Sequence, residues 1–291
     1  MSSKILDFSK WLCRASQSSK LMTGTLGITS NQEATLQKLE DKIASGKPLT
    51  PLQEIEYNKL LCSKADRSLP KTAQSYLRAE HREMKYDRIF LFTNKYTQKG
   101  ILQEDESITL LSNHLGVPLF KNEERRENKF FTGLPDLTPK IIKHGIDVKS
   151  SWELGTFPYD GDPLDPVYES QNQVYMNLWD CDRWDTVYCL VNATDQMVYN
   201  EKQKFYYALG QPDLEDPIYI GICKEIEKKM IFDKKRFDDA YPMFNWDTED
   251  WTYDIPEEDR VVSFTSIRND EYVKEMEERV VVGREYLKSL K

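Results

Sequence analysis

Residues 133–149 read Gly-Leu-Pro-Asp-Leu-Thr-Pro-Lys-Ile-Ile-Lys-His-Gly-Ile-Asp-Val-Lys, a pattern that predicts two β-strands joined by a turn. Side chains alternate between the two faces of a strand. Asp147 and Lys149 therefore share one face, while Ile146 and Val148 share the other and pack into a core. The stretch thus presents charged groups on one side of a strand whose other side is buried.

A turn at residues 138–140 would return the chain so that Asp136 lies beside Asp147. Two converging carboxylates supply the hard oxygen ligands that Mg²⁺ or Mn²⁺ prefers. Lys149 beside such a site could hold, or help to deprotonate, a water at the metal, which suits hydrolysis of a phosphate ester. Taken alone, an Asp-x-Lys pair is more often a solvated surface, so that alternative stays open unless neighbouring elements supply matching groups.

A helix predicted over about residues 102–115 supplies one such group. Its apolar stripe consists of Ile108, Leu111 and Leu115, and Glu104 falls on the same stripe. A carboxylate on a buried face is costly unless it is paired or bound to a cation. Alternatively, Glu104 lies in a solvated first turn and only favours the helix dipole. The sequence leaves both interpretations open.

A second helix, predicted over about residues 167–180, places Gln171 and Tyr175 on one edge. Over the metal site, this amide and phenol would form hydrogen bonds with a substrate phosphate or sugar. Alternatively, Tyr175 is half-buried core and Gln171 is a surface amide. The Gly- and Pro-rich residues 154–166 before this helix predict a loop that could gate the site or contact substrate.

The predicted elements around these residues follow the order helix, three strands, helix, strand. The strands are expected at residues 117–120, 129–136, 141–150 and 186–191, with a turn at 122–128. The last strand is continuously apolar, as expected for a strand that is buried on both faces.

The flanking regions extend this core. Residues 1–29 look irregular, and three helices are predicted within 30–85, the first two opened by capping boxes at Ser30–Glu33 and Thr50–Gln53. After residue 192, helices are predicted at 201–209, at 224–240 and from about 269 onward, and strands at 218–222 and 260–266. We therefore divide the chain into a helical N-terminal region (1–85), a core (86–192) and a C-terminal extension packed on the core (193–291).

The composition of the 291 residues is typical of a soluble globular protein, with 39% hydrophobic and 31% charged residues. No apolar run reaches the length of a membrane span. The five cysteines form no Cys-x-x-Cys pair, which disfavours a zinc ribbon or a cysteine-bound iron–sulfur cluster and favours reduced thiols. Because the N-terminus also lacks a signal-peptide pattern, we expect a cytoplasmic protein.

The formal net charge of −9 argues against a protein that coats nucleic acid, but it permits local binding. Seven acidic residues lie within 247–259, a segment expected to sit away from any DNA path. Basic residues cluster near the proposed site instead: Lys121, Arg125, Arg126, Lys129, Lys140, Lys143 and Lys149. A charge run is usually a solvated face, so the cluster is only permissive.

Together, these residues resemble the PD-(D/E)XK nuclease superfamily. The resemblance rests on Glu104 on a helix, Pro135-Asp136, Asp147-Val148-Lys149, and Gln171-x-x-x-Tyr175 on a second helix. The glutamine–tyrosine element is similar to the lambda-exonuclease, YqaJ and RecB-like branch, as is Gly100 four residues before Glu104. Each motif is short, but their order and spacing across residues 100–176 are more specific than any single one. Asp147 stands where many members have Glu.

The resemblance implies a restriction-endonuclease-like αβββαβ core within an α+β fold, and Mg²⁺-dependent cleavage of DNA, for which Mn²⁺ can substitute. For phage members it implies 5′→3′ digestion of duplex DNA ends that feeds a single-strand annealing protein in recombination. It also makes a homo-oligomer plausible, since toroidal trimers occur in the family.

The resemblance also implies a role for each matching residue. Asp136 and Asp147 would bind Mg²⁺ together with the backbone carbonyl of Val148, and Glu104 would complete the coordination or orient a water. Lys149 would position and activate the attacking water. Gln171 and Tyr175 would hold the DNA strand near its scissile phosphate.

Two other functions remain open at this level. The same fold could serve an endonuclease, either restriction-like or junction-resolving, which would not need a DNA end. A non-catalytic DNA-binding, assembly or DNA-mimic protein with a decayed core would suit the acidic composition, although the intact acidic and lysine positions argue against decay.

Overall fold

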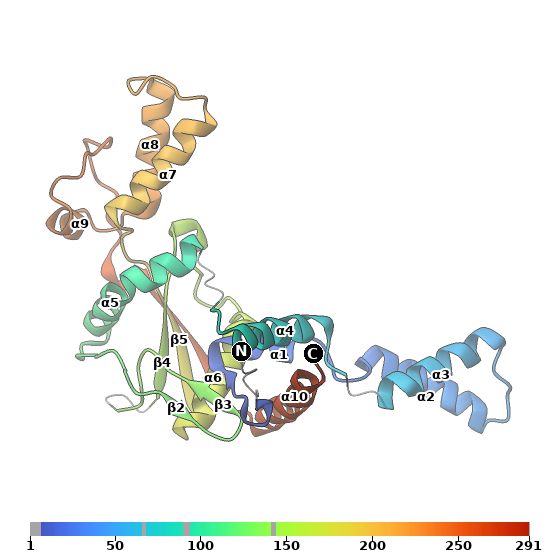
Figure 1. Ribbon diagram of the computed structural model, residues 1–291. Coiled ribbons are helices and arrows are strands. Elements are labelled where there is room, and N and C mark those ends of the chain that lie inside the picture. The colour runs from blue at the N-terminus through green and yellow to red at the C-terminus, as the bar shows by residue number, and fades with distance from the viewer. Residues whose placement is uncertain (1–6, 66–67, 90–93, 141–143, 291) are drawn as a thin grey trace.

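The computed structural model describes residues 7–65, 68–89, 94–140 and 144–290, and shows a mixed α+β fold (Figure 1). Its central sheet has the order β4-β5-β6, formed by Gly145–Ser150, Arg183–Cys189 and Val261–Ile267. β4 and β5 run parallel, and β6 is antiparallel to β5. Among the described helices, none is long and apolar enough to cross a bilayer.

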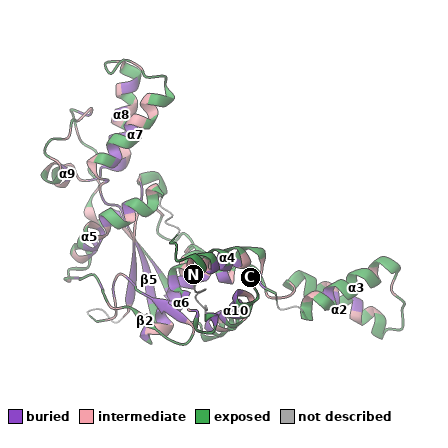
Figure 2. Ribbon diagram, viewed as in Figure 1, coloured by how far each residue is buried: buried purple, intermediate pink, exposed green. Residues whose placement is uncertain are grey.

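Two helices cover opposite faces of this sheet. On one face, α5 (Lys95–Leu115) packs Ile108 and Leu111 against Ile146 and Val187. On the other face lies α6 (Pro166–Trp179), which forms the crossover between the parallel strands β4 and β5. The sheet and α6 form the most continuously buried part of the molecule (Figure 2).

A second, smaller sheet flanks α6. It has the order β1-β3-β2, formed by Cys13–Arg14, Phe131–Gly133 and Arg126–Glu127. Beyond β3, the chain makes an isolated antiparallel bridge between Leu137 and Ile146, which attaches it to the start of β4. This bridge positions the end of the β3 segment beside the central sheet.

The N-terminal segment and the last helix pack together on α6. The segment comprises η1 (Phe8–Lys10), β1, η2 (Ala15–Gln17) and α1 (Ser18–Met22), and it shares an apolar core with α4 (Lys71–Tyr86), α6 and α10 (Asp270–Ser289). Arg279 of α10 donates to the carbonyl oxygens of Leu21 and Gly24, at 3.0 and 2.7 Å. Arg284 donates to the carbonyl oxygen of Trp11 at 2.9 Å.

Two further groups of helices have apolar clusters of their own. The hairpin of α2 (Ser30–Ala44) and α3 (Pro51–Ala65) extends away from the body around Leu36, Leu39 and Leu60 (Figure 1). On the other side, α7 (Asp195–Ala208), α8 (Pro217–Met230) and α9 (Lys234–Ala240) pack with the segment before the 3₁₀ helix η4 (Glu257–Arg260). A further 3₁₀ turn, η3 (Leu154–Thr156), follows β4.

Several predicted elements differ in the structure. Residues 117–120 form no strand; Pro118 lacks a donor for a ladder, and Leu119 instead anchors the segment in the core on the α5 face of the sheet. The strand predicted at 129–136 is only three residues long, and the turn predicted at 122–128 contains β2. The strand expected at 141–150 begins at Gly145 within the described chain, and residues 141–143 lie outside it.

The helical predictions also need correction. Residues 218–222 are helical, within α8, because Asp216 accepts from the backbone N–H groups of Ile218 and Tyr219 and Pro217 opens the helix. Residues 224–240 belong to two helices, α8 and α9. Helix α5 begins at Lys95 under an Asn94 cap, and α7 begins at Asp195 under a Thr194 cap. The first capping box pairs Thr29 with Gln32, one residue before the predicted position.

Candidate active site

Asp136 and Asp147 lie together where the Leu137–Ile146 bridge joins the β3 segment to β4. The backbone N–H of Val148 donates to Asp136 Oδ2 at 2.7 Å, which fixes this carboxylate against the strand that carries Asp147. Burial and then the nearby charge of Asp147 raise the pKa of Asp136 to about 7. The two carboxylates therefore repel each other in a site that water hydrates poorly.

Lys149 forms an ion pair with Asp147, and both project from the same face of β4 as the alternation predicts. The Asp147 side chain is only 3% exposed and that of Lys149 is 24% exposed, so the pair is not a solvated surface pair. Burial disfavours protonated Lys149, but the charges of Asp147 and Asp136 outweigh burial and raise the pKa of Lys149 above its usual value. The lysine is therefore a cation in this structure.

Gln171 and Tyr175 are both buried against this pair. Gln171 Nε2 donates to Asp147 Oδ1 at 3.0 Å and contacts the Tyr175 hydroxyl at 3.1 Å. Burial, with Asp147 and Asp136, raises the pKa of Tyr175 well above its usual value, so the phenol keeps its proton. Gln171 is not a surface amide; it orients the Asp147 carboxylate directly.

Glu104 reaches the site from the middle of α5. The helix begins nine residues earlier, at Lys95, so the first-turn alternative does not apply. Glu104 Oε2 accepts from Lys121 Nζ at 2.8 Å, and the negative charge of Glu104 contributes to the raised pKa of Asp136. Glu104 Oε1 is buried and has no hydrogen-bond partner among the residues that the structure describes. A carboxylate oxygen in that position favours a cation nearby.

These groups fit a hard divalent cation. No three His, Cys, Asp or Glu side chains in the described chain form a ready-made metal cluster. Mg²⁺, however, commonly uses one or two carboxylates and takes the rest of its octahedron from water and other oxygens. Asp136 and Asp147, with the raised pKa of Asp136 and the unpaired oxygen of Glu104, provide such a pair of ligands and excess negative charge around it.

Two glycines allow the backbone to approach this closely. A Cβ on Gly145 would lie 2.2 Å from the Trp184 ring, and a Cβ on Gly133 would lie 2.9 Å from Tyr175 Cε1. Gly145 opens β4, and Gly133 ends β3. Both glycines therefore set the distance between α6, the central sheet and the segment that carries Asp136. Sequence reasoning assigned neither of them a role.

Sequence reasoning assigned no role to Tyr168. Its ring centroid lies 4.6 Å from Lys149 Nζ, a cation–π contact on the side of the lysine nearest the start of α6. Tyr168 precedes Gln171 by three residues and Tyr175 by seven, so all three share one face of a helix. That spacing was a usable signal.

The predicted basic cluster is largely paired within the protein. Lys121 is bound to Glu104, while Arg126 and Lys140 are both bound to Glu124. Arg126 also lies over the Trp179 ring, with 5.0 Å between Cζ and the centroid. Lys143 lies outside the described residues.

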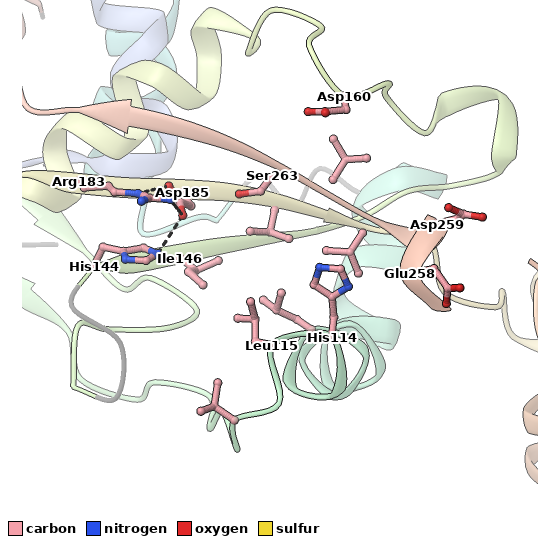
Figure 3. Close-up of a pocket in the computed structure, with 15 residues that line it drawn as sticks. His114, Leu115, His144, Ile146, Asp160, Arg183, Asp185, Glu258, Asp259 and Ser263 are labelled. Atoms are coloured by element: carbon pink, nitrogen blue, oxygen red, sulfur yellow. Dashed lines mark hydrogen bonds and ion pairs between the residues drawn. The ribbon is translucent and has the colours of Figure 1, made fainter. Parts of the chain in front are cut away.

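A cavity of about 740 Å³ lies on the opposite face of the sheet, with Ile146 and Val187 in its wall (Figure 3). His144 Nε2 contacts Asp185 Oδ2 at 2.9 Å, and Arg183 makes two hydrogen bonds to the same carboxylate. Burial alone would raise the pKa of Asp185, but the hydrogen bonds from His144, Arg183 and Thr265 lower it to about 2. This carboxylate is fully paired, which is typical of a structural group.

No protein-family model matches the sequence, and no curated protein is significantly similar to it. The fold, however, is similar to that of a solved structure described as a phage-related exonuclease from Haemophilus somnus 129PT. That similarity has a TM-score of 0.60 and 24% sequence identity over 96% of this chain and 94% of the other. An alkaline exonuclease (LHK-Exo) from Laribacter hongkongensis gives a TM-score of 0.45 and 12% identity over 97% and 90%. The first similarity establishes the fold, and the chain spans nearly the whole of that neighbour.

Proposed function

We propose that this protein is a Mg²⁺-dependent deoxyribonuclease that hydrolyses phosphodiester bonds from the ends of duplex DNA. The observation that carries the proposal is the buried group of Asp136, Asp147 and Lys149, in which Gln171 orients the carboxylate of Asp147. The fold shared with a phage-related exonuclease supports end-dependent digestion over internal cleavage.

Each residue has a chemical task in this proposal. Asp136 and Asp147, with the carbonyl of Val148, would hold the cation, and Glu104 would complete the site or orient a water. Bound Mg²⁺ or Mn²⁺ would supply Lewis-acid activation of the phosphate and of the attacking water. Lys149 would direct an N–H toward that water. Gln171 donates to both Asp147 and the Tyr175 hydroxyl, and Gln171 and Tyr175 would hold the DNA strand near its scissile phosphate.

The proposal also covers the polarity of digestion, the role in recombination, the oligomeric state and the location in the cell. We expect 5′→3′ polarity and a role in phage-type homologous recombination, with the product strand passed to a single-strand annealing protein. We also expect a homo-oligomer, with a trimer as the leading arrangement, that acts in the cytoplasm of the host cell. These expectations rest on the resemblance of the motif set.

The test is cleavage of linear duplex DNA labelled at the 5′ or the 3′ end, beside covalently closed circles, in Mg²⁺ or in EDTA. We expect loss of linear DNA only, with label released first from the 5′ end, and at least a 100-fold loss of rate in Lys149→Ala. Lys235→Ala, an exposed lysine of α9, is the matched control and should retain full activity. Cut circles would replace the proposal with an endonuclease, and no cleavage in any metal would leave a binding protein.

Metal binding is tested separately by titrating Mg²⁺ into the protein without DNA in a calorimeter. We expect a binding heat that is lost in Asp147→Asn and kept in Lys235→Ala. An unchanged heat in Asp147→Asn would place the cation elsewhere and remove the basis of the mechanism.

A further inference from the structure

A cavity of about 490 Å³ lies beside the candidate active site, between the loop of residues 158–166 and the central sheet. Its floor is formed by Tyr188 of β5 and Phe264 of β6, and its outer wall contains Pro158, Pro163 and Pro166. No residue discussed so far as metal-binding or catalytic lines it.

The cavity opens on the same face of the sheet as Asp147 and Lys149. In the parallel pairing of β4 with β5, Lys149 lies opposite Tyr188, so the two side chains share a face. In the next pairing, Thr186 lies opposite Phe264, and alternation places Phe264 on that face as well. The cavity is therefore one strand across from the catalytic lysine.

A row of aromatic rings connects the two places. Lys149 Nζ lies 4.6 Å from the Tyr168 centroid, the rings of Tyr168 and Tyr188 are 6.2 Å apart, and those of Tyr188 and Phe264 are 5.7 Å apart. Burial is the main cause that raises the pKa of Tyr188, and Tyr168, Asp165 and Asp147 add to it. Tyr188 thus lies between the cavity and the strand that carries Asp147 and Lys149.

The lining favours a nucleobase over a phosphate. The described residues around the cavity include no basic side chain, whereas Asp162 and Asp165 lie at its rim. One oxygen of each acid is already engaged, Asp162 Oδ2 with the N–H of Tyr159 and Asp165 Oδ1 with the N–H of Val167. The remaining oxygens can accept from the exocyclic amino group of a base, and they would repel a phosphate. Aromatic and proline surfaces suit a flat π-system.

We propose that this cavity binds the nucleobase next to the scissile phosphate, packed on Tyr188, while that phosphate lies at Asp136, Asp147 and Lys149. The inference rests on the proposed nuclease function and adds a substrate requirement to it. A base in this cavity cannot remain paired in a duplex, so the terminal base pair must open before cleavage. The acidic rim further favours bases that carry an amino group over thymine.

The first test is a binding measurement that needs no cleavage. A duplex carrying 2-aminopurine at its terminal or penultimate position is mixed with the protein in EDTA or Ca²⁺, and fluorescence is recorded. Stacking quenches this base, so we expect quenching at one of the two positions with the wild type and with Tyr188→Phe. Tyr188→Leu should remove it, and Tyr207→Leu, at an exposed tyrosine of α7, should not.

The second test is a double-mutant cycle in which one change is Tyr188→Leu in the protein and the other is removal of a base from the substrate. Initial cleavage rates are measured on normal ends and on ends with an abasic residue at the same two positions. Base–aromatic stacking is worth about 1–3 kcal/mol, so the abasic end or Tyr188→Leu alone should each lower kcat/KM by about 5-fold to 150-fold. Tyr188→Leu acting on the abasic end should lower kcat/KM by no more than either change alone.

The outcomes separate the two proposals. Independent, multiplicative losses together with unchanged quenching in Tyr188→Leu would overturn the nucleobase site and leave the nuclease intact. Quenching that depends on Tyr188 in a protein that cleaves no DNA would leave the base-binding cavity and remove the catalytic function. Thymine ends cleaved as fast as adenine or cytosine ends would contradict the role given to the acidic rim.

Discussion

At the residue scale, the site combines charges that the fold alone does not balance. Asp136 and Asp147 lie beside Lys149. Glu104, which is paired with Lys121 through one oxygen, adds a further carboxylate whose other oxygen has no hydrogen-bond partner among the described residues. Such a group is costly without a cation, because each buried carboxylate loses hydration that hydrogen bonds and opposite charge must replace. In the proposed function, a bound metal ion would offset this loss of stability.

This loss of stability predicts that Asp136→Asn will stabilise the metal-free protein while abolishing cleavage. The raised pKa of Asp136 means that its charged form destabilises the fold, so stability falls as pH rises from about 4 to about 7. At pH 8 in EDTA, Asn should raise the free energy of unfolding by about 1–3 kcal/mol, and its amide oxygen can still accept from Val148. Urea denaturation in EDTA measures this; a lower stability of the variant would show that the carboxylate is already balanced.

Lys99 is a second buried charge, outside the reaction chemistry. The whole residue is buried, with 0% exposure. Its ammonium group donates to the carbonyl oxygens of Val191 at 2.7 Å and Trp152 at 3.1 Å. It thereby ties the first turns of α5, the helix that carries Glu104, to the ends of β4 and β5. Burial lowers the pKa of Lys99 to about 7.

The pKa of Lys99 predicts a specific pH dependence of stability. Between about pH 7 and the unfolded value of 10.5, the unfolded chain binds a proton that the folded chain has released, so stability rises with pH in that window. Lys99→Met should be less stable than the wild type at pH 8.5 and should lose this rise. The difference between the two proteins in urea denaturation at pH 6.5, 7.5 and 8.5 isolates the contribution of Lys99. If the stabilities of wild type and Lys99→Met changed with pH in parallel, the pH dependence assigned to Lys99 would be contradicted. Lys235→Met should show the wild-type dependence of stability on pH.

At the element scale, the sequence specified the central part of the fold well and its edges less well. β4, β5, β6, α6 and α10 were predicted close to their observed positions, because their apolar side chains follow a strand or helix pattern. The first half of α8 was predicted as a strand because Ile-Tyr-Ile-Gly-Ile alternates like one, whereas Asp216 and Pro217 before it form a strong helix start. In the small sheet, β3 lies within the strand predicted at 129–136, whereas the two-residue strands β1 and β2 depend on tertiary pairing and were not predicted.

The candidate site was also predicted in part. Asp136, Asp147, Lys149, Gln171 and Tyr175 do lie together, since strand alternation and helical spacing both fix side-chain direction. Tyr168 was assigned no role, and sequence reasoning did not predict the pairing of Lys121 with Glu104, which depends on a loop whose path local rules do not give. The metal ligands, the substrate contacts and the division of the chain at residues 85 and 192 stay predictions.

Gly145, the first residue of β4, leads to a prediction about stability. A methyl group on Gly145 would lie 2.2–2.4 Å from three atoms of Trp184, whose side chain is fully buried beneath α6. We expect Gly145→Ala to lower the free energy of unfolding by about 1–3 kcal/mol or more, because the added methyl group fits only if the buried ring or the strand shifts. Gly221→Ala in α8, where a Cβ meets nothing within 4 Å, should instead stabilise by about 0.5–1 kcal/mol. Thermal unfolding of both variants decides the point.

At the scale of the whole molecule, the α2–α3 hairpin is set apart from the body. Its apolar cluster of Leu36, Leu39 and Leu60 is separate from the other cores, and Leu52 and Ile55 on its surface are 80% and 66% exposed. The six tryptophans all lie outside it: Trp11, Trp152, Trp179, Trp184, Trp246 and Trp251. Tryptophan fluorescence therefore reports on the rest of the protein only.

This separation predicts local unfolding. Leu60→Ala removes a buried side chain from a small cluster and should destabilise the hairpin by about 2–5 kcal/mol. Hydrogen exchange in residues 30–65 should then accelerate at least tenfold, while the unfolding transition seen by tryptophan fluorescence keeps its midpoint within about 1 °C. A matching drop in that midpoint would mean that the hairpin and the body unfold as one unit.

The bonds of Arg279 and Arg284 have a consequence for the order in which the protein is made. The carbonyl oxygen of Leu21 accepts from Arg279, which lies 258 positions later in the chain. The carbonyl oxygen of Trp11 accepts from Arg284, which lies 273 positions later. On the ribosome, these two carbonyl oxygens therefore lack their donors until α10 has emerged, whereas α4 and α6 emerge earlier and can cover part of the segment. Completion of the core around α6 is therefore a late event, and the interval before α10 closes it depends on the rate of translation.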